Sequence, residues 1–306
     1  MQRFKNILLL LNEDTDDRAA IERAGGLARR NEARLTVLST VEAAPTRLRL
    51  DRASEIADRV AGEARRAAEA VATSLCESGL DAAPVVVTGK RFLEVIRRVL
   101  RERHDLVVMT ADGQGLRDRL LGSTARHLMR KCPCPVWATK PNAAAPYPRV
   151  LAAVDPDPSD ESELALSRKV LTLASSLARL ERSELHIVHA WSLFGESLLR
   201  RHDDRREVDA MADRARATHE EQLATLLHGF TLDDLEHQVH LLKGDPGPTI
   251  AEVTTTLAPD LVVIGTVGRT RLAGFFIGNT AEAVLDRVDC SVLAVKPDGF
   301  VTPVAP

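Results

Sequence analysis

The chain has 306 residues, of which 44% are hydrophobic and 28% charged, a composition typical of a globular protein with two cores of about 150 residues each. Its formal net charge of −3 predicts no broad basic surface, so we expect no nucleic acid partner unless one face is locally enriched in cations. No stretch approaches the roughly 18 uninterrupted apolar residues of a membrane helix, so we expect a soluble, cytoplasmic protein without membrane insertion.

The first predicted elements along the chain are two strands and a long helix. The apolar run Ile7–Leu11 is too short for the apolar core of a signal peptide, so we interpret it as a strand. A second strand is predicted over Arg34–Ser39, and the segment after it has the three- and four-residue spacing of an amphipathic helix. The apolar stripe of this helix consists of Ile56, Val60, Ala64, Ala67, Val71 and Leu75.

Further apolar runs and a proline-rich stretch indicate where the first half ends. Strands are predicted over Val85–Gly89, over Asp105–Met109 and after Cys134, which gives about five strands that alternate with helical segments. The stretch Pro141–Pro148 resists both helix and sheet. We therefore expect an N-terminal domain at residues 1–141, a linker at 142–148 and a C-terminal domain at 149–300.

The second half of the chain repeats the first. Asp105–Met109 matches Asp260–Ile264, and the spacing between matched blocks grows slowly along the chain, as loop insertions produce. Chance does not give this many blocks in the same order. The other matched pairs are Ile7–Asn12 with Val150–Asp155, Arg34–Ser39 with Glu184–His189, Val85–Gly89 with His240–Gly244, Gly122–Ala125 with Gly278–Ala281, Cys134–Val136 with Cys290–Val292, and Lys140–Pro141 with Lys296–Pro297.

The alternation of strands and helices predicts an α/β protein made of two repeated, doubly wound domains, each with a mostly parallel sheet of about five strands. Ligands of such sheets bind at the carboxyl ends of the strands. Asp155 lies at the end of one strand, and Gly265, Gly268 and Gly278 follow the apolar run Leu261–Ile264. Glycines between a buried strand and a helix let the main chain approach a ligand, most often a phosphate.

The spaced glycines resemble those of the universal stress protein family. Nucleotide-binding members of that family carry a glycine, two residues, a glycine, nine residues, a glycine and then serine or threonine. Gly265, Gly268 and Gly278 reproduce the glycines, whereas Asn279 stands at the position of the small hydroxyl residue. The resemblance covers nearly the whole chain and extends to the tandem, E-type subgroup through Gly265–Thr270, Gly278–Glu282, His186–Trp191 and Lys131–Trp137.

This resemblance implies a fold of the adenine-nucleotide alpha-hydrolase type and an internal pseudo-dimer, with the halves paired through their last strands, Val136–Thr139 and Val292–Val295. It also implies a site for ATP or another adenine nucleotide, with no metal expected. In that site, Asp155 would contact adenine, Val188 would line its pocket, Gly265 and Gly268 would border ribose and phosphate, and the amides of Gly278, Asn279 and Thr280 would hold phosphate oxygens.

The first half departs from this pattern. Thr110 replaces the leading glycine, Asn12 replaces the aspartate, and the segment between Gly113 and Gly122 is one residue short. A side chain where the backbone must approach phosphate argues against binding. We therefore expect an empty N-terminal site and nucleotide in the C-terminal half only.

Two functions remain open because of the residues around Gly278. The amide of Asn279 could donate to a phosphate or crowd it, and Phe275–Ile277 could pack on the other domain or line an apolar cavity. The first function is a stress-response regulatory protein with an adenine nucleotide in its C-terminal half. The second is a nucleotide-free interaction protein that binds a small apolar, lipid-like ligand. Both leave protein partners and further oligomerisation open.

Catalytic motifs are missing from the sequence. It contains neither a Gly-x-Ser-x-Gly elbow nor a His-Glu-x-x-His pair, so we expect no enzyme, with slow nucleotide hydrolysis left open. Thr88–Arg91 resembles the end of a phosphate-binding P-loop, but Pro84 stands at the position of the first glycine, and Arg91 replaces the required serine or threonine.

The four cysteines lack metal-site spacing, so we interpret them as reduced structural thiols, although Cys132 and Cys134 could bind a soft metal or respond to redox change. His186 and His189 lie three residues apart on a predicted strand, so their side chains should face opposite sides of the sheet. The arginines at 97–98 and 201–206 have acidic neighbours and are predicted to form ion-paired, solvated helix faces.

Overall fold

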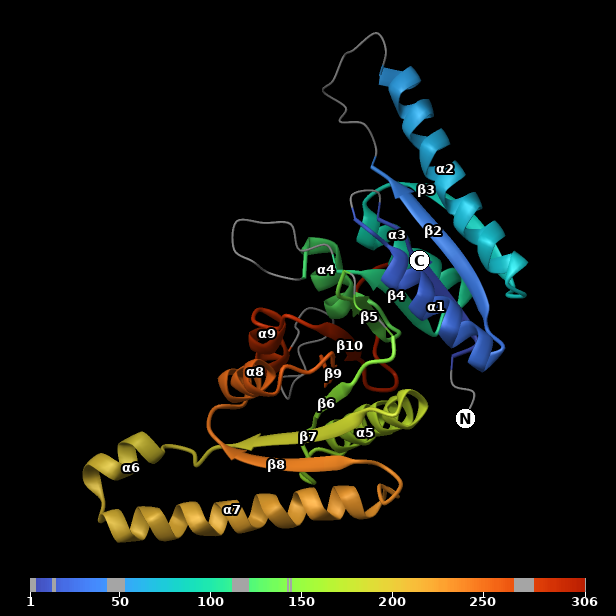
Figure 1. Ribbon diagram of the computed structural model, residues 1–306. Helices are drawn as coiled ribbons and strands as arrows, with labels where there is room; N and C mark the ends of the chain where they lie inside the picture. Colours follow the sequence, from blue (N-terminus) through green and yellow to red (C-terminus); the bar gives the residue numbers. More distant parts are fainter. Residues whose placement is uncertain are drawn as a thin grey trace.

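The structure is a computed structural model that describes residues 4–12, 15–42, 53–111, 121–141, 143, 145–266 and 278–305. Within these ranges, the N-terminal half contains five strands that alternate with four helices (Figure 1). In chain order they are β1 (Asn6–Leu10), α1 (Arg18–Asn31), β2 (Arg34–Val41), α2 (Ala53–Glu77), β3 (Ala82–Thr88), α3 (Arg91–Glu102), β4 (Leu106–Thr110), α4 (Ser123–Lys131) and β5 (Val136–Thr139).

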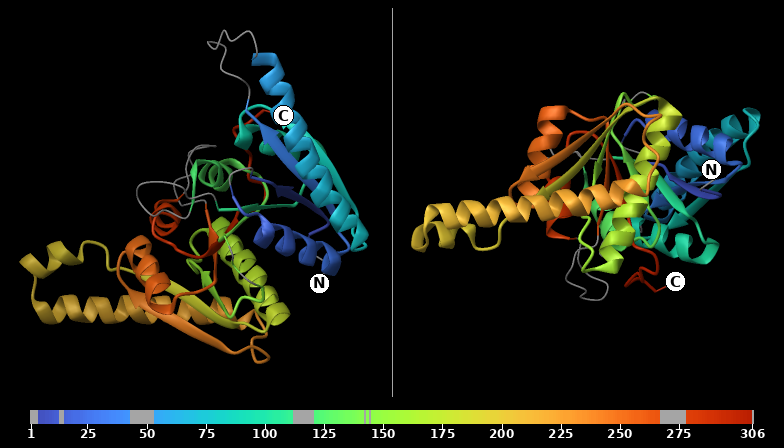
Figure 2. Two further views of the ribbon diagram at one scale, coloured as in Figure 1. Left: turned by 45° about the horizontal axis from the view of Figure 1, so that its top comes forward. Right: turned by 90° about the horizontal axis from the view of Figure 1, so that it is seen from below.

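The C-terminal half repeats this order with one additional short helix, α6. Its elements are β6 (Arg149–Ala153), α5 (Glu161–Glu181), β7 (Glu184–Trp191), α6 (Glu196–His202), α7 (Arg205–His228), β8 (His237–Lys243), α8 (Pro246–Leu257), β9 (Leu261–Gly265), α9 (Asn279–Leu285) and β10 (Ser291–Val295). The helix α6 and the first part of α7 extend beyond the sheet (Figure 2). No helix in the described ranges is long and apolar enough to cross a membrane.

All ten strands form one continuous sheet with the order β3-β2-β1-β4-β5-β10-β9-β6-β7-β8. Within each half every pair of neighbouring strands is parallel, and the strand order is the same in both halves. The halves meet at β5 and β10, which pair antiparallel, with Trp137 opposite Leu293. The predicted fold class is therefore confirmed, including the internal pseudo-dimer through the last strands.

Helices cover both faces of the sheet and define two apolar cores. One core contains residues of α1, α2, α5 and α7 together with one set of alternating strand residues. The other contains residues of α3, α4, α8 and α9 together with the opposite set. Both cores run across both halves, because strands of one half continue the sheet of the other. The two domains consequently share their cores.

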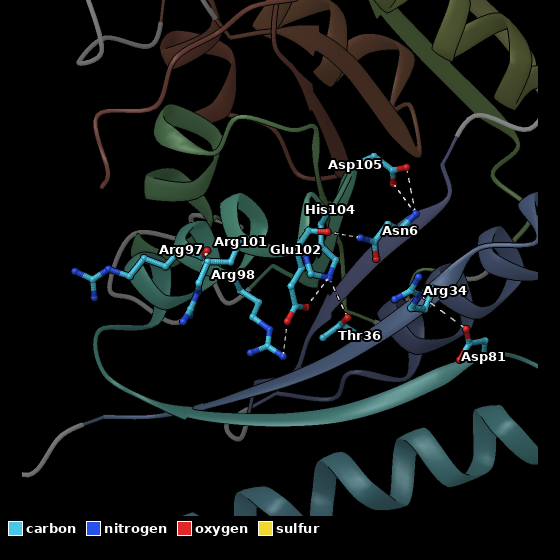
Figure 3. Close-up of polar contacts among 10 residues, drawn as sticks. All are labelled: Asn6, Arg34, Thr36, Asp81, Arg97, Arg98, Arg101, Glu102, His104 and Asp105. Carbon is cyan, nitrogen blue, oxygen red and sulfur yellow. Dashed lines mark hydrogen bonds and ion pairs between the residues drawn. The ribbon is translucent and has the colours of Figure 1, made fainter. Parts of the chain in front are cut away.

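Equivalent aspartates fix the start of the first strand in both halves. The carboxylate of Asp105 accepts hydrogen bonds from the backbone amides of Lys5 (2.6 Å) and Asn6 (3.1 Å), as Figure 3 shows for Asn6. The carboxylate of Asp260 accepts one from the amide of Arg149 at 2.8 Å. These aspartates lie at the amino ends of the strands, so the matched sequence blocks that begin with them serve the fold.

The long helix α2 lies where the sequence predicts it, but its predicted apolar stripe is partly wrong. Ala64 and Leu75 are buried as expected, whereas Ile56 is 50% exposed and Ala67 lies on the exposed side. The buried stripe runs instead through Ala64, Ala68, Ala72 and Leu75. A helix with many alanines offers several stripes of similar hydrophobicity, and packing on the sheet selects one of them.

The predicted ion-paired helix face is confirmed at the first of its two positions. The guanidinium of Arg97 lies 2.6 Å from the carboxylate of Glu94, and that of Arg98 lies 2.8 Å from the carboxylate of Glu102 (Figure 3 shows the second pair). In the 201–206 segment, Arg205 lies 3.9 Å from Asp209. Such pairs within one exposed helix contribute little to stability.

A buried ion pair joins the two halves on the face of the sheet that carries α1 and α5. Arg23 of α1 and Glu181 of α5 form this pair, and their side chains are 3% and 5% exposed. The second oxygen of Glu181 accepts a hydrogen bond from the amide of Tyr147 at 2.7 Å. The Arg23 guanidinium lies 4.0 Å from the ring centroid of Tyr147 and 5.0 Å from that of Trp137. These contacts fix the linker residue Tyr147 between the halves.

We predict that removing one member of this ion pair costs about 3 to 5 kcal/mol of unfolding free energy, because the other charge stays buried without compensation. Arg23→Met and Glu181→Leu are the single changes, and urea unfolding of the full chain is the measurement. The double variant should recover much of the loss, since it leaves no isolated charge.

Arg34→Gln is the matched control, because Arg34 and Asp81 are both well exposed and 3.9 Å apart. Its expected change is within about 0.5 kcal/mol. Equal, small effects of Arg23→Met and Arg34→Gln would show that the buried pair does not hold the halves together.

Candidate functional site

The carboxyl edge of the C-terminal half brings together several of the predicted site residues. Asp155 follows β6, Val188 lies in β7, and Gly265 ends β9. These three strands are neighbours, with Ala153 opposite both Val188 and Ile264. The backbone of Asp155 is fixed by the Ser167 hydroxyl, which donates to the Asp155 carbonyl at 2.7 Å. Val188 is fully buried in the core, beneath the edge.

The remaining predicted residues lie at the start of α9. Gly278 occupies the N-cap position, Asn279 is the first helical residue, and Thr280 follows it. Asn279 therefore lies inside the helix and does not cap it. The Gly278 amide donates to the carbonyl of Thr266 at 3.2 Å, which places the start of α9 beside the end of β9. Gly268 and Phe275–Ile277 lie outside the described residues.

A further glycine, Gly247, lies at this edge, and the sequence motifs did not predict it as a site residue. It lies in the first turn of α8, and a Cβ atom there would be 2.8 Å from the Cβ atom of Ala283 and 3.8 Å from the Asn279 carbonyl oxygen. Glycine therefore allows the first turn of α8 to approach α9 closely. The signal was available in the sequence as Gly247-Pro248, directly after the matched block that ends at Gly244.

In the N-terminal half, side chains bond to one another at the same edge. Arg91, the first residue of α3, donates from Nη1 to the Asn12 side-chain oxygen and from Nε to the Thr40 hydroxyl, each at 3.0 Å. Asn12 is the equivalent of Asp155, and Arg91 is the equivalent of Pro246. The first turn of α8 therefore supplies no guanidinium at the position that Arg91 occupies in α3.

A second N-terminal contact involves Asp17, which lies at the N-cap position of α1 but makes no capping hydrogen bond. Its carboxylate instead accepts hydrogen bonds from the Thr110 hydroxyl (2.5 Å) and the Asn12 amide (2.6 Å). Burial raises the pKa of Asp17, and these hydrogen bonds oppose the rise. In the C-terminal half, Gly265 replaces Thr110, and Asp160 replaces Asp17 and caps α5.

The helices at the two edges are also spaced differently. In the N-terminal half, Phe92 of α3 stacks on His127 of α4 with a centroid distance of 4.2 Å. The equivalent residues in the C-terminal half are Gly247 and Ala283, whose small size lets α8 and α9 approach. Four replacements of large by small residues therefore distinguish the C-terminal edge: Arg91 by Pro246, Phe92 by Gly247, Thr110 by Gly265 and His127 by Ala283.

A buried lysine connects the C-terminal edge to the N-terminal half. Lys296 follows β10 and is 1% exposed. Its ammonium donates to the Thr266 hydroxyl at 2.6 Å and to the carbonyls of Met129 (2.5 Å) and Arg130 (3.2 Å) in α4. Burial lowers the pKa of Lys296 to about 7. Thr266, which directly follows Gly265, is thereby connected to a helix of the other half.

The other residues with possible chemistry have structural partners. Three of the four free cysteines are buried, and the sulfurs of Cys132 and Cys134 lie 3.6 Å apart. His186 pairs with His240 and His189 with His219, each at 3.0 Å between ring nitrogens. Their separate partners confirm that His186 and His189 do not face each other. The described residues contain no group of three or more potential ligands that could hold a metal ion.

Two surface cavities lie away from this edge. One, of about 910 Å³, is a groove between α5 and the end of α7, lined by residues such as Arg168, Thr172 and Thr225. The other, of about 530 Å³, lies near the linker and includes Lys140, Tyr147 and Asp260. Neither cavity is lined by a predicted site residue.

The structure is that of a tandem α/β protein built from two copies of one doubly wound domain. The repeated strand order and the antiparallel junction of β5 with β10 define this class, together with the glycines at the carboxyl edge. The chain belongs to the universal stress protein family, whose model matches residues 3–140 and 146–296. Its role accordingly lies in the stress response.

The similarity extends over the whole tandem arrangement, as the sequence predicts for the E-type subgroup. The chain is 30% identical to Universal stress protein E of Salmonella typhi, with 99% of this chain and 98% of that protein covered. A solved structure from Pseudomonas aeruginosa is 25% identical with a TM-score of 0.72, covering 98% of this chain and 95% of that chain. A universal stress protein from Archaeoglobus fulgidus, 19% identical, shares the fold with a TM-score of 0.65 over 95% of this chain and 98% of that chain.

We predict that Lys296→Met flattens the dependence of stability on pH. The folded pKa of about 7 lies below the ordinary value of 10.5, so the unfolded chain binds more protons between these values. Stability should therefore rise with pH across this window, by up to about tenfold per pH unit in the unfolding equilibrium constant. Urea unfolding of both proteins between pH 6.5 and 9 measures the difference. Parallel curves for the two proteins would contradict the prediction.

Proposed function

We propose that the protein is a stress-response regulator that binds an adenine nucleotide in its C-terminal half only, and that it acts by binding and not by catalysis. Asp155 would contact the adenine, with Val188 beneath it as the floor of the pocket. Gly265 and Gly268 would border ribose and phosphate. The amides of Asn279 and Thr280 would donate to phosphate oxygens, as helix starts commonly do. The Gly278 amide, which donates to the Thr266 carbonyl in this structure, would join them by exchanging that partner for the phosphate.

The observation that carries this proposal is the difference between the two edges. In the N-terminal half, the guanidinium of Arg91 and the carboxylate of Asp17 bond to Asn12 and Thr110, at the position where a ligand would lie. In the C-terminal half, proline and glycine replace Arg91 and Thr110. Backbone amides can approach a phosphate closely where side chains are small. The same comparison supports an empty nucleotide site in the N-terminal half.

Asn279 keeps the second candidate function open. Asn279 is exposed at the first position of α9, where the nucleotide-binding pattern has a smaller side chain with a hydroxyl group. If this amide crowds the phosphate, the C-terminal edge would accept a small apolar ligand or a protein partner in place of a nucleotide. The first candidate is favoured because the glycine spacing and Asp155 are retained.

The proposal also includes the organisation of the chain. We assign residues 1–141 to an N-terminal domain, 142–148 to the linker and 149–300 to a C-terminal domain, which is supported by the passage from β5, ending at Thr139, to β6, starting at Arg149. A cytoplasmic location is part of the proposal, since free, buried thiols suit a reducing compartment.

The first prediction from this proposal is that the purified protein binds added ATP, ADP or AMP with a stoichiometry of one nucleotide per chain. Denaturing the protein as purified and analysing the released small molecules measures what it already carries. Binding of added nucleotide is measured by calorimetry and by a rise in melting temperature. Failure of all three nucleotides to bind, with none released, would favour the nucleotide-free candidate.

The second prediction uses two equivalent helix caps. Gly278→Val should abolish nucleotide binding, because a branched side chain would occupy the space of the phosphate at the start of α9. Gly122→Val, at the equivalent cap of α4, should leave binding unchanged. Circular dichroism checks that both variants fold. Equal loss of binding in the two variants would show that the site is not confined to the C-terminal half.

The third prediction transfers one closing side chain to the C-terminal edge. Pro246→Arg should lower the nucleotide affinity at least about tenfold, because the new guanidinium can reach Asp155 as Arg91 reaches Asn12. Proline is not required at this first helical position, so the helix should form normally. Arg91→Gln is the control in the other half and should leave the affinity unchanged. Unaltered affinity in Pro246→Arg would remove Asp155 from the proposed site.

A further inference from the structure

Two lysines of the N-terminal half meet at one aromatic ring. Lys90, which precedes α3, and Lys131, the last residue of α4, each place their ammonium nitrogen 5.1 Å from the ring centroid of Phe92. The two nitrogens are therefore no further apart than twice that distance. Within the described parts of the chain, neither lysine forms an ion pair.

The third member of this group is His127 of α4, whose imidazole stacks on the same Phe92 ring. Its Nδ1 atom is buried and has no hydrogen-bond partner among the described residues. Burial lowers the pKa of His127, and the positive charges of Lys131, Lys90 and Arg130 lower it further. Arg130 pairs with Glu282, so among the described residues only the two lysines of this group have no carboxylate partner.

A stabilising role for these lysines explains the arrangement poorly. One ammonium on an aromatic face gains a modest cation–π attraction, but a second ammonium on the same ring adds repulsion between like charges. The pair Lys243 and Trp191 shows how the chain otherwise builds such a contact. There the ammonium lies 5.7 Å from the Trp191 ring centroid and is compensated by Glu196 at 2.7 Å.

We propose that Lys90, Lys131 and His127 form an anion site between α3 and α4, which takes a phosphate dianion, free or as a monoester. An anion between the ammonium groups replaces their repulsion by two charge-assisted hydrogen bonds. The Phe92 ring, which is buried, forms the floor that the two ammonium groups and the imidazole share. The C-terminal half has no equivalent of this anion site, because Gly247 and Ala283 stand at the positions of Phe92 and His127.

The charge distribution of the chain supports an anion at this place. Lys and Arg outnumber Asp and Glu in residues 1–141, whereas acidic residues outnumber basic ones in 142–306. An anion is therefore attracted to the N-terminal half even though the chain as a whole carries a net charge of −3. Lys90 belongs to the segment that resembles an incomplete P-loop. In this site it contributes charge without the backbone cradle of that motif.

The imidazole of His127 is the reporter for the first experiment. The full chain carrying Gly278→Val, which silences the proposed nucleotide site, is isotopically labelled, and the histidine signals are followed by NMR against pH. Replacing chloride by inorganic phosphate at equal ionic strength should raise the pKa of His127 by about one unit, since a bound dianion favours the imidazolium. His127→Gln identifies the signal. An identical pKa in phosphate and chloride would overturn the proposal.

The second experiment measures affinity directly by equilibrium dialysis of inorganic phosphate in the same background. Lys90→Gln with Lys131→Gln should weaken binding at least about tenfold, whereas Lys243→Gln, the matched lysine with its own carboxylate, should leave it unchanged. If the double variant fails to fold, the same measurement is made on Lys90→Gln and on Lys131→Gln separately. Equal losses in the Lys243 and Lys90 variants would overturn the proposal.

The source of the phosphate is distinguished by using AMP as a second probe. If AMP and inorganic phosphate each bind when tested separately, the ligand is a phosphomonoester. If only inorganic phosphate binds, the ligand is the free ion. Binding of neither overturns the site. Because every arm uses the Gly278→Val chain, a negative result here leaves the proposal for the C-terminal half unaffected.

Discussion

The antiparallel pairing of β5 with β10 is the constraint on which the rest of the structure depends. It converts two five-stranded sheets into one and buries the last strand of each half at the centre of the molecule. A slip of one residue in this register would turn the core-facing side chains of β10, such as Leu293, to the opposite face. The pairing also brings α4 beside α9, where Arg126 and Arg130 form ion pairs with Asp286 and Glu282. The C-terminal edge is therefore built partly on the N-terminal half.

Duplication followed by divergence explains why the two edges differ while the fold does not. Residues that hold the sheet have stayed equivalent, such as Asp105 and Asp260 at the starts of the first strands. Residues at the carboxyl edge differ between the halves: the bonded pair Arg91 and Asn12 corresponds to Pro246 and Asp155. Each set is consistent within itself. A cation with an amide oxygen closes one edge, and the equivalent positions of the other edge carry a proline and a carboxylate.

Most of the fold could be predicted from the sequence because it depends on local patterns repeated twice. Short apolar runs, helical periodicity and the matched blocks were sufficient for the strands and their number, whereas the junction of the halves through their last strands followed from the resemblance to the family. The stripe of α2 could not be assigned fully, because alanines at neighbouring positions differ little in hydrophobicity. The closing contacts of the N-terminal edge were also missed. Arg91 reaches Asn12 across 79 positions of the chain, and such a contact depends on tertiary packing that periodicity does not contain.

The two proposed sites would recognise anions in two physically different ways. At the proposed C-terminal site, an anion would meet backbone amides, whose positions and partial charges are fixed by the fold. Between α3 and α4, recognition rests on flexible lysine side chains with full charges, of which Lys90 is exposed. Salt screens exposed full charges strongly and fixed amides in a partly buried site weakly. The proposed nucleotide site would need this amide geometry to overcome the repulsion from the acidic C-terminal half, whereas the basic N-terminal half attracts anions before any contact is made.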